Sequence, residues 1–329
     1  MNVNITSKFS IIIPVYDRVD YVRKAVDSCL RQEYDRENIE IIVVKNFLDY
    51  DLEAWFRQES VLYVDSDKVN LVDKLIEGIS ISSGDIICLL EDDDEFVSNK
   101  LETLYEQYKN FPNVACLHNN FRYKEENGYR INKFYLKHRK NLRKAILLKK
   151  AEKKFALIRH KDVYHNLSCW SIRRNYIFKL LNDLSGLTYN IDFLLYVEVI
   201  EQQAEMLILP DQLTIYRRHD SASRIAFDDQ KIIVLFESSI FSLQTVKNKM
   251  VNRKLRCFIK SNIYIEQFKI NIVEEKYLKI TDVKDSLNII TYPVYIRSEL
   301  YPFLFLYLIL GIFRKFRKNS YIKTAHILN

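Results

Sequence analysis

The feature of this sequence with the clearest chemical meaning is the acidic run Glu91–Asp94, the first four of five consecutive acidic residues in the stretch LLEDDDEF. The run follows five apolar residues, Ile86–Leu90, which is the pattern of a buried strand. Carboxylates crowded in this way repel one another, so a compensating charge is needed. A hard divalent cation, Mg²⁺ or Mn²⁺, supplies that charge and can also hold a diphosphate. The alternative is a solvated acidic turn that caps a helix starting near Asn99.

The elements around the acidic run alternate between strands and helices. Apolar, β-branched runs predict strands at residues 9–15, 39–44, 60–64, 85–90 and 113–117. Apolar residues at helical spacing predict helices at residues 18–31, 51–58, 68–81 and 99–108. This alternation indicates an α/β fold, with a mainly parallel sheet flanked by helices on both faces. Ligands of such sheets bind at the carboxyl ends of the strands, which is where the acidic run lies.

Composition narrows the class of protein. The chain has 329 residues, 48% hydrophobic and 28% charged, which is typical of a globular protein with one large domain or a domain plus an appendage. It has only five glycines and neither a GxGxxG nor a GxxxxGK[ST] motif, so a Gly-rich phosphate loop is not expected. Five scattered cysteines and the absence of a cleavable signal pattern favour a reducing, cytoplasmic compartment.

Positive charge is unevenly spread, with one segment dense in Lys and Arg at residues 132–154 and a second basic cluster at 314–318. The net charge is +7, and the second cluster, RKFRK at 314–318, directly follows the apolar stretch YPFLFLYLILGIF. That stretch, about 14 apolar residues long, is shorter than the roughly 20 needed to span a bilayer. The sequence shows no DNA or RNA recognition motif that would explain the basic cluster. An apolar stretch followed by basic residues instead predicts that segment 300–318 contacts the inner face of the cell membrane at its interface. The alternative is a buried helix packed on the main domain.

Three ordered motifs resemble the glycosyltransferases of family 2, which have the GT-A fold. They are FSIIIPVYDR, IEIIVV and GDIICLLEDDDEF, and the resemblance extends over about residues 9 to 225. It implies a Rossmann-like GT-A catalytic domain at 1–225, with a nucleotide-sugar-binding half at about 1–120 and an acceptor-binding half at 121–225. Residues 226–329 would then form a helical C-terminal extension.

In this family the acidic element after the fourth strand is the DxD motif, which binds a metal and the diphosphate of the donor. The resemblance places Glu91 and Asp93 at its two acidic positions, and a shift by one residue would place Asp92 and Asp94 there. We expect Asp93 to bind Mn²⁺ or Mg²⁺ directly. Asp94 is expected at the metal with it, and Asp92 at the donor.

The loop after the first strand is the place where the family holds the nucleotide base and ribose. The resemblance assigns this contact to Pro14, Tyr16, Asp17 and Arg18. The second strand departs from the family, because it ends in Lys45 and Asn46 instead of acidic residues. Asn46 could still bond a base, and either Asp49 or Asp51 could replace the missing carboxylate. The nucleotide base of the donor is therefore not assigned, and both a UDP-sugar and a GDP-sugar are candidates.

The stretch HNLSCWSIRR resembles the acceptor segment of the family. There Trp170 would stack on a sugar ring, and Arg173 or Arg174 would contact phosphate. The alternative places Trp170 in the core and the two arginines on an exposed helix.

Two further motifs carry the proposed chemistry. In LTYNIDF, Asp192 stands where inverting members of the family have the base that takes the proton from the attacking hydroxyl, although Ile191 replaces the usual first acid. A helix N-cap is the alternative role of Asp192. In IYRRHDSASR, His219 would lie near the metal or diphosphate. Arg217 or Arg218 would offset the charge of the leaving diphosphate.

These residues together predict an inverting, metal-dependent hexosyl- or related transferase that uses a nucleotide sugar. The acceptor would be a growing glycan, which includes a lipid-linked one, and nucleic acid is not expected as a partner. Two alternatives belong to other classes: a non-catalytic sugar-nucleotide-binding protein and a nucleotidyltransferase. The second would release pyrophosphate from a nucleoside triphosphate.

Overall fold

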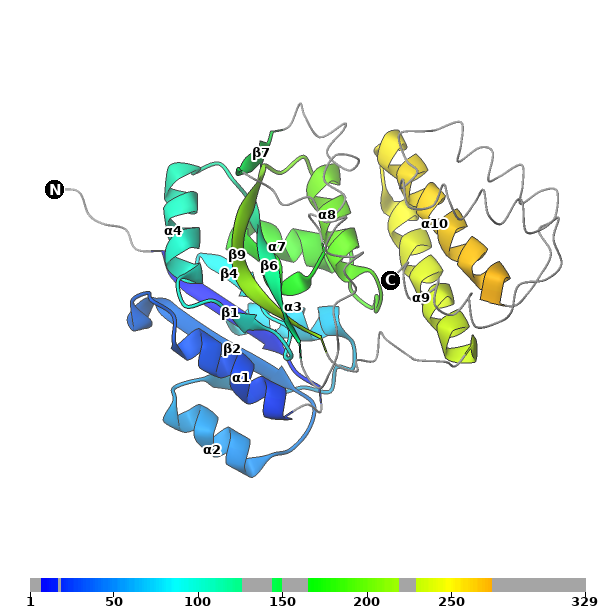
Figure 1. Cartoon of the computed structure of the whole chain (residues 1–329). Helices are drawn as coiled ribbons and strands as arrows, with labels where there is room; N and C mark the ends of the chain where they lie inside the picture. Colours follow the sequence, from blue (N-terminus) through cyan, green and yellow to red (C-terminus); the bar gives the residue numbers. More distant parts are fainter. Residues whose placement is uncertain (1–6, 17–18, 126–143, 150–164, 219–228, 274–329) are drawn as a thin grey trace. The chain divides into compact units, whose positions relative to one another are not determined.

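A computed structural model describes residues 7–16, 19–125, 144–149, 165–218 and 229–273 of the chain (Figure 1). The chain divides into two compact units, residues 1–219 and residues 220–329. The first unit is an α/β structure, as predicted, and the described part of the second is helical. The predicted boundary at residue 225 lies within residues 219–228, outside the described residues.

The first half of unit 1 is a parallel sheet with helices between its strands. The strands, which are hydrogen-bonded in the order β3-β2-β1-β4, are β1 (Phe9–Pro14), β2 (Ile39–Lys45), β3 (Leu62–Asp65) and β4 (Ile86–Leu89). The intervening helices are α1 (Val19–Leu30), η1 (Arg36–Asn38), α2 (Tyr50–Gln58) and α3 (Leu71–Ile81). These elements confirm the alternation predicted from the sequence, and the strands differ from the predicted bounds by a few residues.

The second half of unit 1 continues the same sheet with mixed strand directions. Its strands are β5 (Glu95–Phe96), β6 (Cys116–Glu125), β7 (Ile146–Leu148), β8 (Trp170–Arg173) and β9 (Met206–Arg218). Its helices are α4 (Lys100–Asn110), η2 (Leu167–Cys169), α7 (Arg174–Asn182) and α8 (Ile191–Glu201). Strand β8 lies antiparallel between β4 and β6, and β9 runs parallel to β6. The sequence did not predict this inserted antiparallel strand.

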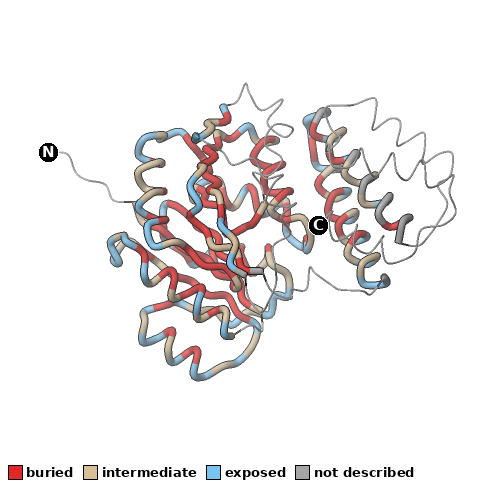
Figure 2. Tube along the Cα trace, in the orientation of Figure 1, coloured by how far each residue is buried: buried red, intermediate tan, exposed pale blue. Residues whose placement is uncertain are grey.

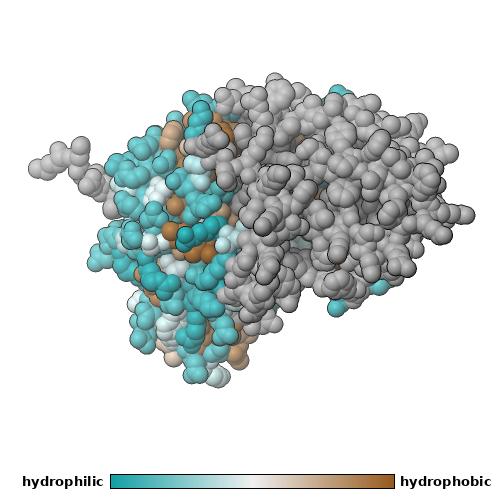
Figure 3. All heavy atoms as spheres, viewed as in Figure 1, coloured by the Kyte–Doolittle hydropathy of each residue, from teal (hydrophilic) through white to brown (hydrophobic). Residues whose placement is uncertain are grey.

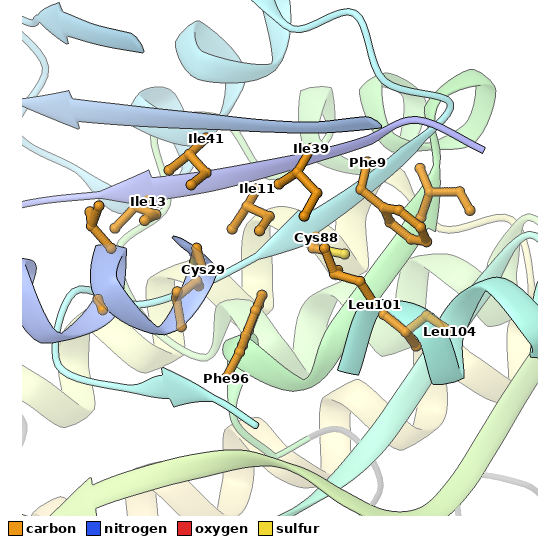
Figure 4. Packing of buried hydrophobic residues seen from close by; sticks show 14 of the residues in the cluster. Phe9, Ile11, Ile13, Cys29, Ile39, Ile41, Cys88, Phe96, Leu101 and Leu104 are labelled. Carbon is orange, nitrogen blue, oxygen red and sulfur yellow. The ribbon is translucent and has the colours of Figure 1, made fainter. Parts of the chain in front are cut away.

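The core lies on both faces of this sheet. Figure 2 shows the strands as the most buried part of unit 1, and Figure 4 shows one apolar layer in which Ile11 and Ile13 of β1 face Cys29 of α1. On the other face α3 approaches closely: a Cβ on Gly78 would lie 2.7 Å from Cγ2 of Ile12 and 2.9 Å from Cγ2 of Val44. Glycine at position 78 therefore lets α3 sit against β1 and β2, and this fixes the position of the side chains that α3 carries.

The described part of unit 2 is a pair of helices, α9 (Asp229–Lys249) and α10 (Arg253–Val273), which contact each other. Their buried apolar residues include Phe236, Leu243 and Ile259. This confirms the predicted helical pattern as far as residue 273. Among the described residues, no helix is both long enough and apolar enough to cross a bilayer. The predicted membrane segment 300–318 lies outside the described residues.

Candidate functional site

The acidic run forms a tight turn between β4 and β5. The amide of Asp94 donates a hydrogen bond to the carbonyl oxygen of Glu91, with an N···O distance of 3.1 Å. Asp92 and Asp94 are each 1% exposed, whereas Glu91 and Asp93 are half-buried. The turn therefore encloses Asp92 and Asp94 more completely than Glu91 and Asp93.

Asp94 fixes the turn to the second half of the sheet. Its Oδ2 accepts hydrogen bonds from Ser168 Oγ at 2.7 Å and from Asn166 Nδ2 at 2.8 Å, and its Oδ1 accepts one from the Arg217 amide at 3.1 Å. Burial, and after it repulsion from Asp93, raises the pKa of the Asp94 carboxyl to about 7. These three hydrogen bonds give Asp94 a role in positioning the turn. The metal-ligand role of Asp94 stays a prediction.

Asp92 joins the acidic turn to the loop after β1. Its Oδ2 accepts a hydrogen bond of 3.0 Å from the amide of Tyr16, which directly follows Pro14 and Val15 in the chain. Pro14 ends β1, so the predicted nucleotide loop and the acidic turn meet at one edge of the sheet. Asp17 and Arg18, which belong to the same prediction, lie outside the described residues.

Lys74 is a buried residue of this site that the sequence analysis missed. Its Nζ donates to the carbonyl of Val15 at 2.5 Å and to Oδ1 of Asn46 at 2.9 Å, and it lies 4.0 Å from the ring centroid of Tyr16. Burial lowers the pKa of Lys74 to about 8, and the charge of Asp92 opposes that shift. One amino group thus ties together the ends of β1 and β2. Its place one helical turn before Gly78, on the apolar face of α3, is the signal that could have found it.

The end of β2 explains the departure from the family pattern. Lys45 is fully buried, and its Nζ pairs with Glu53 of α2 at 2.7 Å and with Asp65 at the end of β3. Asp49 is the N-cap of α2, where its Oδ1 accepts a hydrogen bond of 2.9 Å from the Leu52 amide. Its N-cap role argues against Asp49 as a replacement for the missing carboxylate.

Glu91 and Asp93 form the open side of the acidic turn. Burial raises the pKa of Glu91 well above its usual range, and repulsion from Asp93 adds to this. Asp94, Asp192 and Asp92 contribute in the same direction. The charged form of Glu91 is thus disfavoured in this cluster, and a divalent cation would stabilise it.

The donor set of the turn is suited to a cation held jointly with a ligand. Within the described ranges, no three His, Cys, Asp or Glu side chains are grouped so as to hold a metal ion by themselves. Magnesium that binds together with phosphate oxygens needs only one or two protein carboxylates. The half-buried carboxylates of Glu91 and Asp93 fit this requirement. His219, the third predicted metal ligand, lies outside the described residues.

Asp192 lies in the first turn of α8. Its Oδ1 accepts a hydrogen bond of 2.7 Å from the Phe193 amide, and its Oδ2 accepts one of 3.1 Å from the Asn166 amide. Oδ2 is also 3.9 Å from Nδ1 of His165. The N-cap position of α8 belongs to Asn190 and not to Asp192. The carboxylate is therefore held by its neighbours next to the acidic turn, and its side chain remains 25% exposed.

Asn166 connects the two acidic parts of the site, and the sequence analysis did not identify it. Its backbone has φ +76°, in the left-handed region that asparagine tolerates better than most residues. It is 4% exposed, and it bonds Asp94 through its side chain and Asp192 through its amide. No local sequence pattern indicates this role, because Asn166 is 72 positions from Asp94 and 26 positions from Asp192.

Arg217 of β9 contacts the backbone of the acidic turn. Its Nε donates to the carbonyl oxygen of Asp93 at 2.9 Å, and its guanidinium forms an ion pair with Glu95. The residue is only 2% exposed, so its charge is already paired inside the protein. The predicted contact with phosphate therefore does not fit Arg217. Arg218 ends β9, and its side chain is outside the described part.

The three residues predicted to bind the acceptor are not brought to this site. Trp170 is fully buried in β8, with its ring centroid 5.2 Å from that of His118, so it belongs to the core. Arg173 pairs in register with Ile86 at the start of β4, at the opposite end from the acidic turn, and bonds backbone carbonyls there. The side chain of Arg174 bonds Ser82 Oγ near the same end. The antiparallel direction of β8 carries Arg173 and Arg174 away from the acidic turn, whereas Trp170 lies at the acidic-turn end of β8 and is excluded by its burial.

The fold and the site define an α/β protein with an acidic ligand site at the carboxyl edge of its parallel strands. A profile of the family described as "Glycosyl transferase family 2" matches residues 10–181, just over half of the chain. The chain therefore belongs to glycosyl transferase family 2.

Relatives with curated names are similar over part of their length. The chain is 26% identical over 136 residues to "Glycosyltransferase GlyA" of Streptococcus pneumoniae serotype 4, which covers 38% of this chain and 18% of that protein. It is 28% identical over 125 residues to "Glycosyltransferase GlyG" of the same organism, covering 36% and 41%. The chain thus spans less than half the length of either relative.

Solved structures share the fold. The crystal structure of S. aureus TarS 1-349 in complex with UDP-GlcNAc superposes with a TM-score of 0.60 at 14% identity, covering 79% of this chain and 72% of that one. The complex of TarS 1-349 with UDP gives a TM-score of 0.59 at 14% identity, covering 90% and 86%. This likeness confirms the predicted GT-A fold.

Proposed function

We propose that this protein transfers a sugar from a nucleotide-sugar donor to an acceptor hydroxyl, with inversion at the anomeric carbon. The observation that carries the proposal is the bond pattern of Asn166, which holds Asp192 next to the acidic turn. A carboxylate suited to accept a proton and a cluster suited to bind a cation with a diphosphate thereby share one edge of the sheet.

The donor proposed is a UDP-sugar. Its support is the fold likeness to TarS, whose crystal structures contain UDP-GlcNAc and UDP. In this chain the nucleoside would lie against the loop of Pro14 and Tyr16, with Asn46 beside it. Lys74 would keep these groups in place, because it bonds both the loop and Asn46. A GDP-sugar is the alternative that the same experiment tests.

Glu91 and Asp93 would hold Mn²⁺ or Mg²⁺ together with the diphosphate. The bound cation would neutralise the charge that develops on the leaving nucleoside diphosphate. The protein's own part is to keep the two carboxylates in a fixed turn, through Asp94 and Arg217.

Asp192 would act as the base. The acceptor oxygen attacks the anomeric carbon from the face opposite the diphosphate, the bond from that carbon to the phosphate oxygen breaks, and the hydroxyl proton passes to the Asp192 carboxylate. One displacement of this kind inverts the configuration. The acceptor proposed is a glycan, which includes a lipid-linked one. Peripheral contact with the inner face of the cell membrane through 300–318 is part of the same proposal.

Release of nucleoside diphosphate tests this function. The full-length protein is incubated with a panel of UDP- and GDP-sugars, with Mn²⁺ or with a chelator, and UDP or GDP is measured. We expect metal-dependent release from one donor and its loss in Asp192→Asn. Binding of a donor without any release would instead indicate a non-catalytic sugar-nucleotide-binding protein. Pyrophosphate released from a nucleoside triphosphate would indicate a nucleotidyltransferase.

A further inference from the structure

Ser168 of η2 is a polar residue with an exposure of 0%. Most serines stay at the surface of a protein, and on the side of unit 1 that Figure 3 shows the described surface is mostly hydrophilic. A buried polar group costs free energy unless it is hydrogen-bonded. The amide, the carbonyl and the hydroxyl of Ser168 all form hydrogen bonds inside the protein, so their partners indicate its role.

The strand register places Ser168 opposite the start of the acidic turn. Strand β8 pairs antiparallel with β4, and Ser171 is in register with Cys88. The same register, carried three residues beyond this pair toward the acidic turn, brings Ser168 opposite Glu91. Because η2 leads directly into β8, the pairing of the two strands fixes where Ser168 lies.

The hydroxyl of Ser168 joins the two ends of the acidic turn. Its Oγ accepts a hydrogen bond of 3.0 Å from the Glu91 amide and donates one of 2.7 Å to Oδ2 of Asp94. A hydroxyl has one donor and two acceptor positions, so a single group can serve both ends in this way. Asp93 lies on the segment between these ends, and its carboxylate is proposed with that of Glu91 to hold the cation.

The backbone of Ser168 is itself held by other parts of unit 1. Its amide donates a hydrogen bond of 2.7 Å to Oδ1 of Asn166. Its carbonyl oxygen accepts one of 2.8 Å from Nζ of Lys100 on α4 and one of 3.0 Å from Oγ1 of Thr214 on β9. Lys100 and Thr214 are both 0% exposed. The position of the hydroxyl is therefore fixed by buried groups from separate elements.

We infer that Ser168 is a positioning residue of the proposed cation site, because it holds both ends of the turn that carries Glu91 and Asp93. Ser168 itself would touch neither the cation nor the donor. The inference rests on the proposed function, which assigns the cation to these two carboxylates. A serine that served stability alone would, when replaced, lower the stability of unit 1 and leave cation binding by the folded protein unchanged.

Two variants and a matched control test this role in the full-length protein. Ser168→Ala removes the hydroxyl, and Ser168→Cys keeps the size of the side chain but has a weaker donor and acceptor. Ser171→Ala is the control, because Ser171 is also 0% exposed and its hydroxyl lies 3.4 Å from that of Tyr108, away from the acidic turn.

Two measurements are made on each protein. Electron paramagnetic resonance of free Mn²⁺ gives the affinity for Mn²⁺ in the presence of UDP, and separately in the presence of GDP. Amide hydrogen exchange, followed by mass spectrometry, compares a peptide that covers residues 90–95 with peptides from α1. The second measurement reports on the order of the turn and needs no bound ligand.

In Ser168→Ala we expect the affinity for Mn²⁺ with the nucleotide to fall about 10- to 100-fold, the range typical of outer-shell groups of metal sites. The peptide 90–95 should exchange faster, while the peptides from α1 match the wild type. Ser168→Cys should show a smaller fall in affinity, and Ser171→Ala should match the wild type in both measurements. If Ser168→Ala does not fold, as judged by circular dichroism, Ser168→Cys is compared with Ser171→Ala instead.

An affinity for Mn²⁺ that is unchanged in folded Ser168→Ala would overturn the inference. So would exchange that rises equally in all peptides, because the serine would then stabilise the unit as a whole. A wild-type protein that retains Mn²⁺ with neither nucleotide contradicts the cation site of the proposed function. In that case faster exchange confined to residues 90–95 still supports the positioning of the turn by Ser168, and unchanged exchange there refutes it.

Discussion

The amide of Asn166 donates a hydrogen bond to Oδ2 of Asp192 across 3.1 Å. The side chain of the same asparagine bonds Asp94, and this carboxylate in turn accepts a bond from the amide of Arg217 on β9. The proposed base and the acidic turn are thus two parts of one hydrogen-bonded frame.

The first prediction concerns Asp192. Asp192→Asn keeps the size of the side chain but removes the proton acceptor, and it replaces one of the two oxygens that accept backbone hydrogen bonds with an NH2 group. Turnover should fall on the order of 10²–10⁴-fold, the range typical of general base catalysis. Affinity for the donor, measured by titration calorimetry with Mn²⁺, should change little. Full turnover in this variant would exclude Asp192 as the base and direct attention to Glu198, which is buried on the same helix.

The second prediction separates the backbone bond of Asn166 from its side-chain bonds. Glycine adopts a φ of +76° without strain, so Asn166→Gly should keep the amide bond to Asp192. It should lose the side-chain bond to Asp94 and the 2.7 Å bond that Asn166 Oδ1 accepts from the Ser168 amide. Asp94 positions the turn that carries Glu91 and Asp93, and outer-shell groups of a metal site typically contribute about 10- to 100-fold to metal affinity or activity. We expect kcat to fall within that range, together with weaker Mn²⁺ activation.

The control for this variant is Asn190→Gly. Asn190 also has a left-handed backbone, with φ +60°, and its side chain makes no capping bond on α8. The midpoint of thermal unfolding is measured for both variants, because a loss of activity caused only by lost stability would be accompanied by a lower midpoint. If Asn166→Gly is less stable but its folded fraction turns over at the wild-type rate and responds to Mn²⁺ as wild type does, the positioning role is wrong.

The parallel sheet and the acidic turn could be predicted from the sequence because each depends on a local pattern. Runs such as FSIIIP are nearly continuous in apolar residues, with Ser10 as the polar exception, and this is typical of a parallel strand buried on both faces. The acidic residues follow such a run directly, so their place at the strand end needed no long-range information.

The connections of the site could not be predicted in this way. Arg217 reaches Asp93 across 124 positions of sequence, and Lys74 reaches Val15 across 59. Trp170 was assigned to a sugar because of its residue type. Its burial follows from the antiparallel insertion of β8 between β4 and β6, and no periodicity in the sequence indicates that insertion.

The third prediction concerns the two half-exposed carboxylates. Asp93→Asn removes one charge from the open side of the acidic turn, and the donor should then bind with little dependence on Mn²⁺. Asp27→Asn, at an exposed position on α1, controls for the loss of one negative charge. Donor affinity is measured with and without the metal. An unchanged Mn²⁺ dependence in Asp93→Asn would mean that the cation is held elsewhere.

The fourth prediction concerns the basic residues at 314–318. Each cation near an anionic surface contributes up to about 1 kcal/mol, and salt weakens the contribution. Full-length protein should bind vesicles that contain phosphatidylglycerol better than neutral phosphatidylcholine vesicles, with a smaller difference at high salt. Replacing the four basic residues with glutamine should remove that preference. These residues are Arg314, Lys315, Arg317 and Lys318. Equal binding of the variant and the wild type to both kinds of vesicle would contradict the membrane proposal.

The fifth prediction concerns Lys100, a fully buried lysine of α4 that lies under the acidic turn. Its Nζ donates to the carbonyl of Ser168 at 2.8 Å and to Oγ1 of Thr214 at 3.2 Å, and it lies 3.7 Å from the ring centroid of Phe96. Burial lowers the pKa of Lys100 from 10.5 to about 8. Between these two pH values the unfolded chain keeps the proton of this lysine, while the folded protein has released it.

Stability rises with pH wherever the unfolded state binds more protons than the folded state. Lys100 therefore makes the wild type more stable as the pH rises from about 8 toward 10.5, and Lys100→Met should lack this contribution. The free energy of unfolding, measured in urea at several pH values, should increase in the wild type relative to Lys100→Met across that window. Lys109→Met removes an exposed lysine from the same helix and serves as the control. A difference between the wild type and Lys100→Met that stays constant or shrinks with rising pH would show that Lys100 keeps its proton in the folded protein.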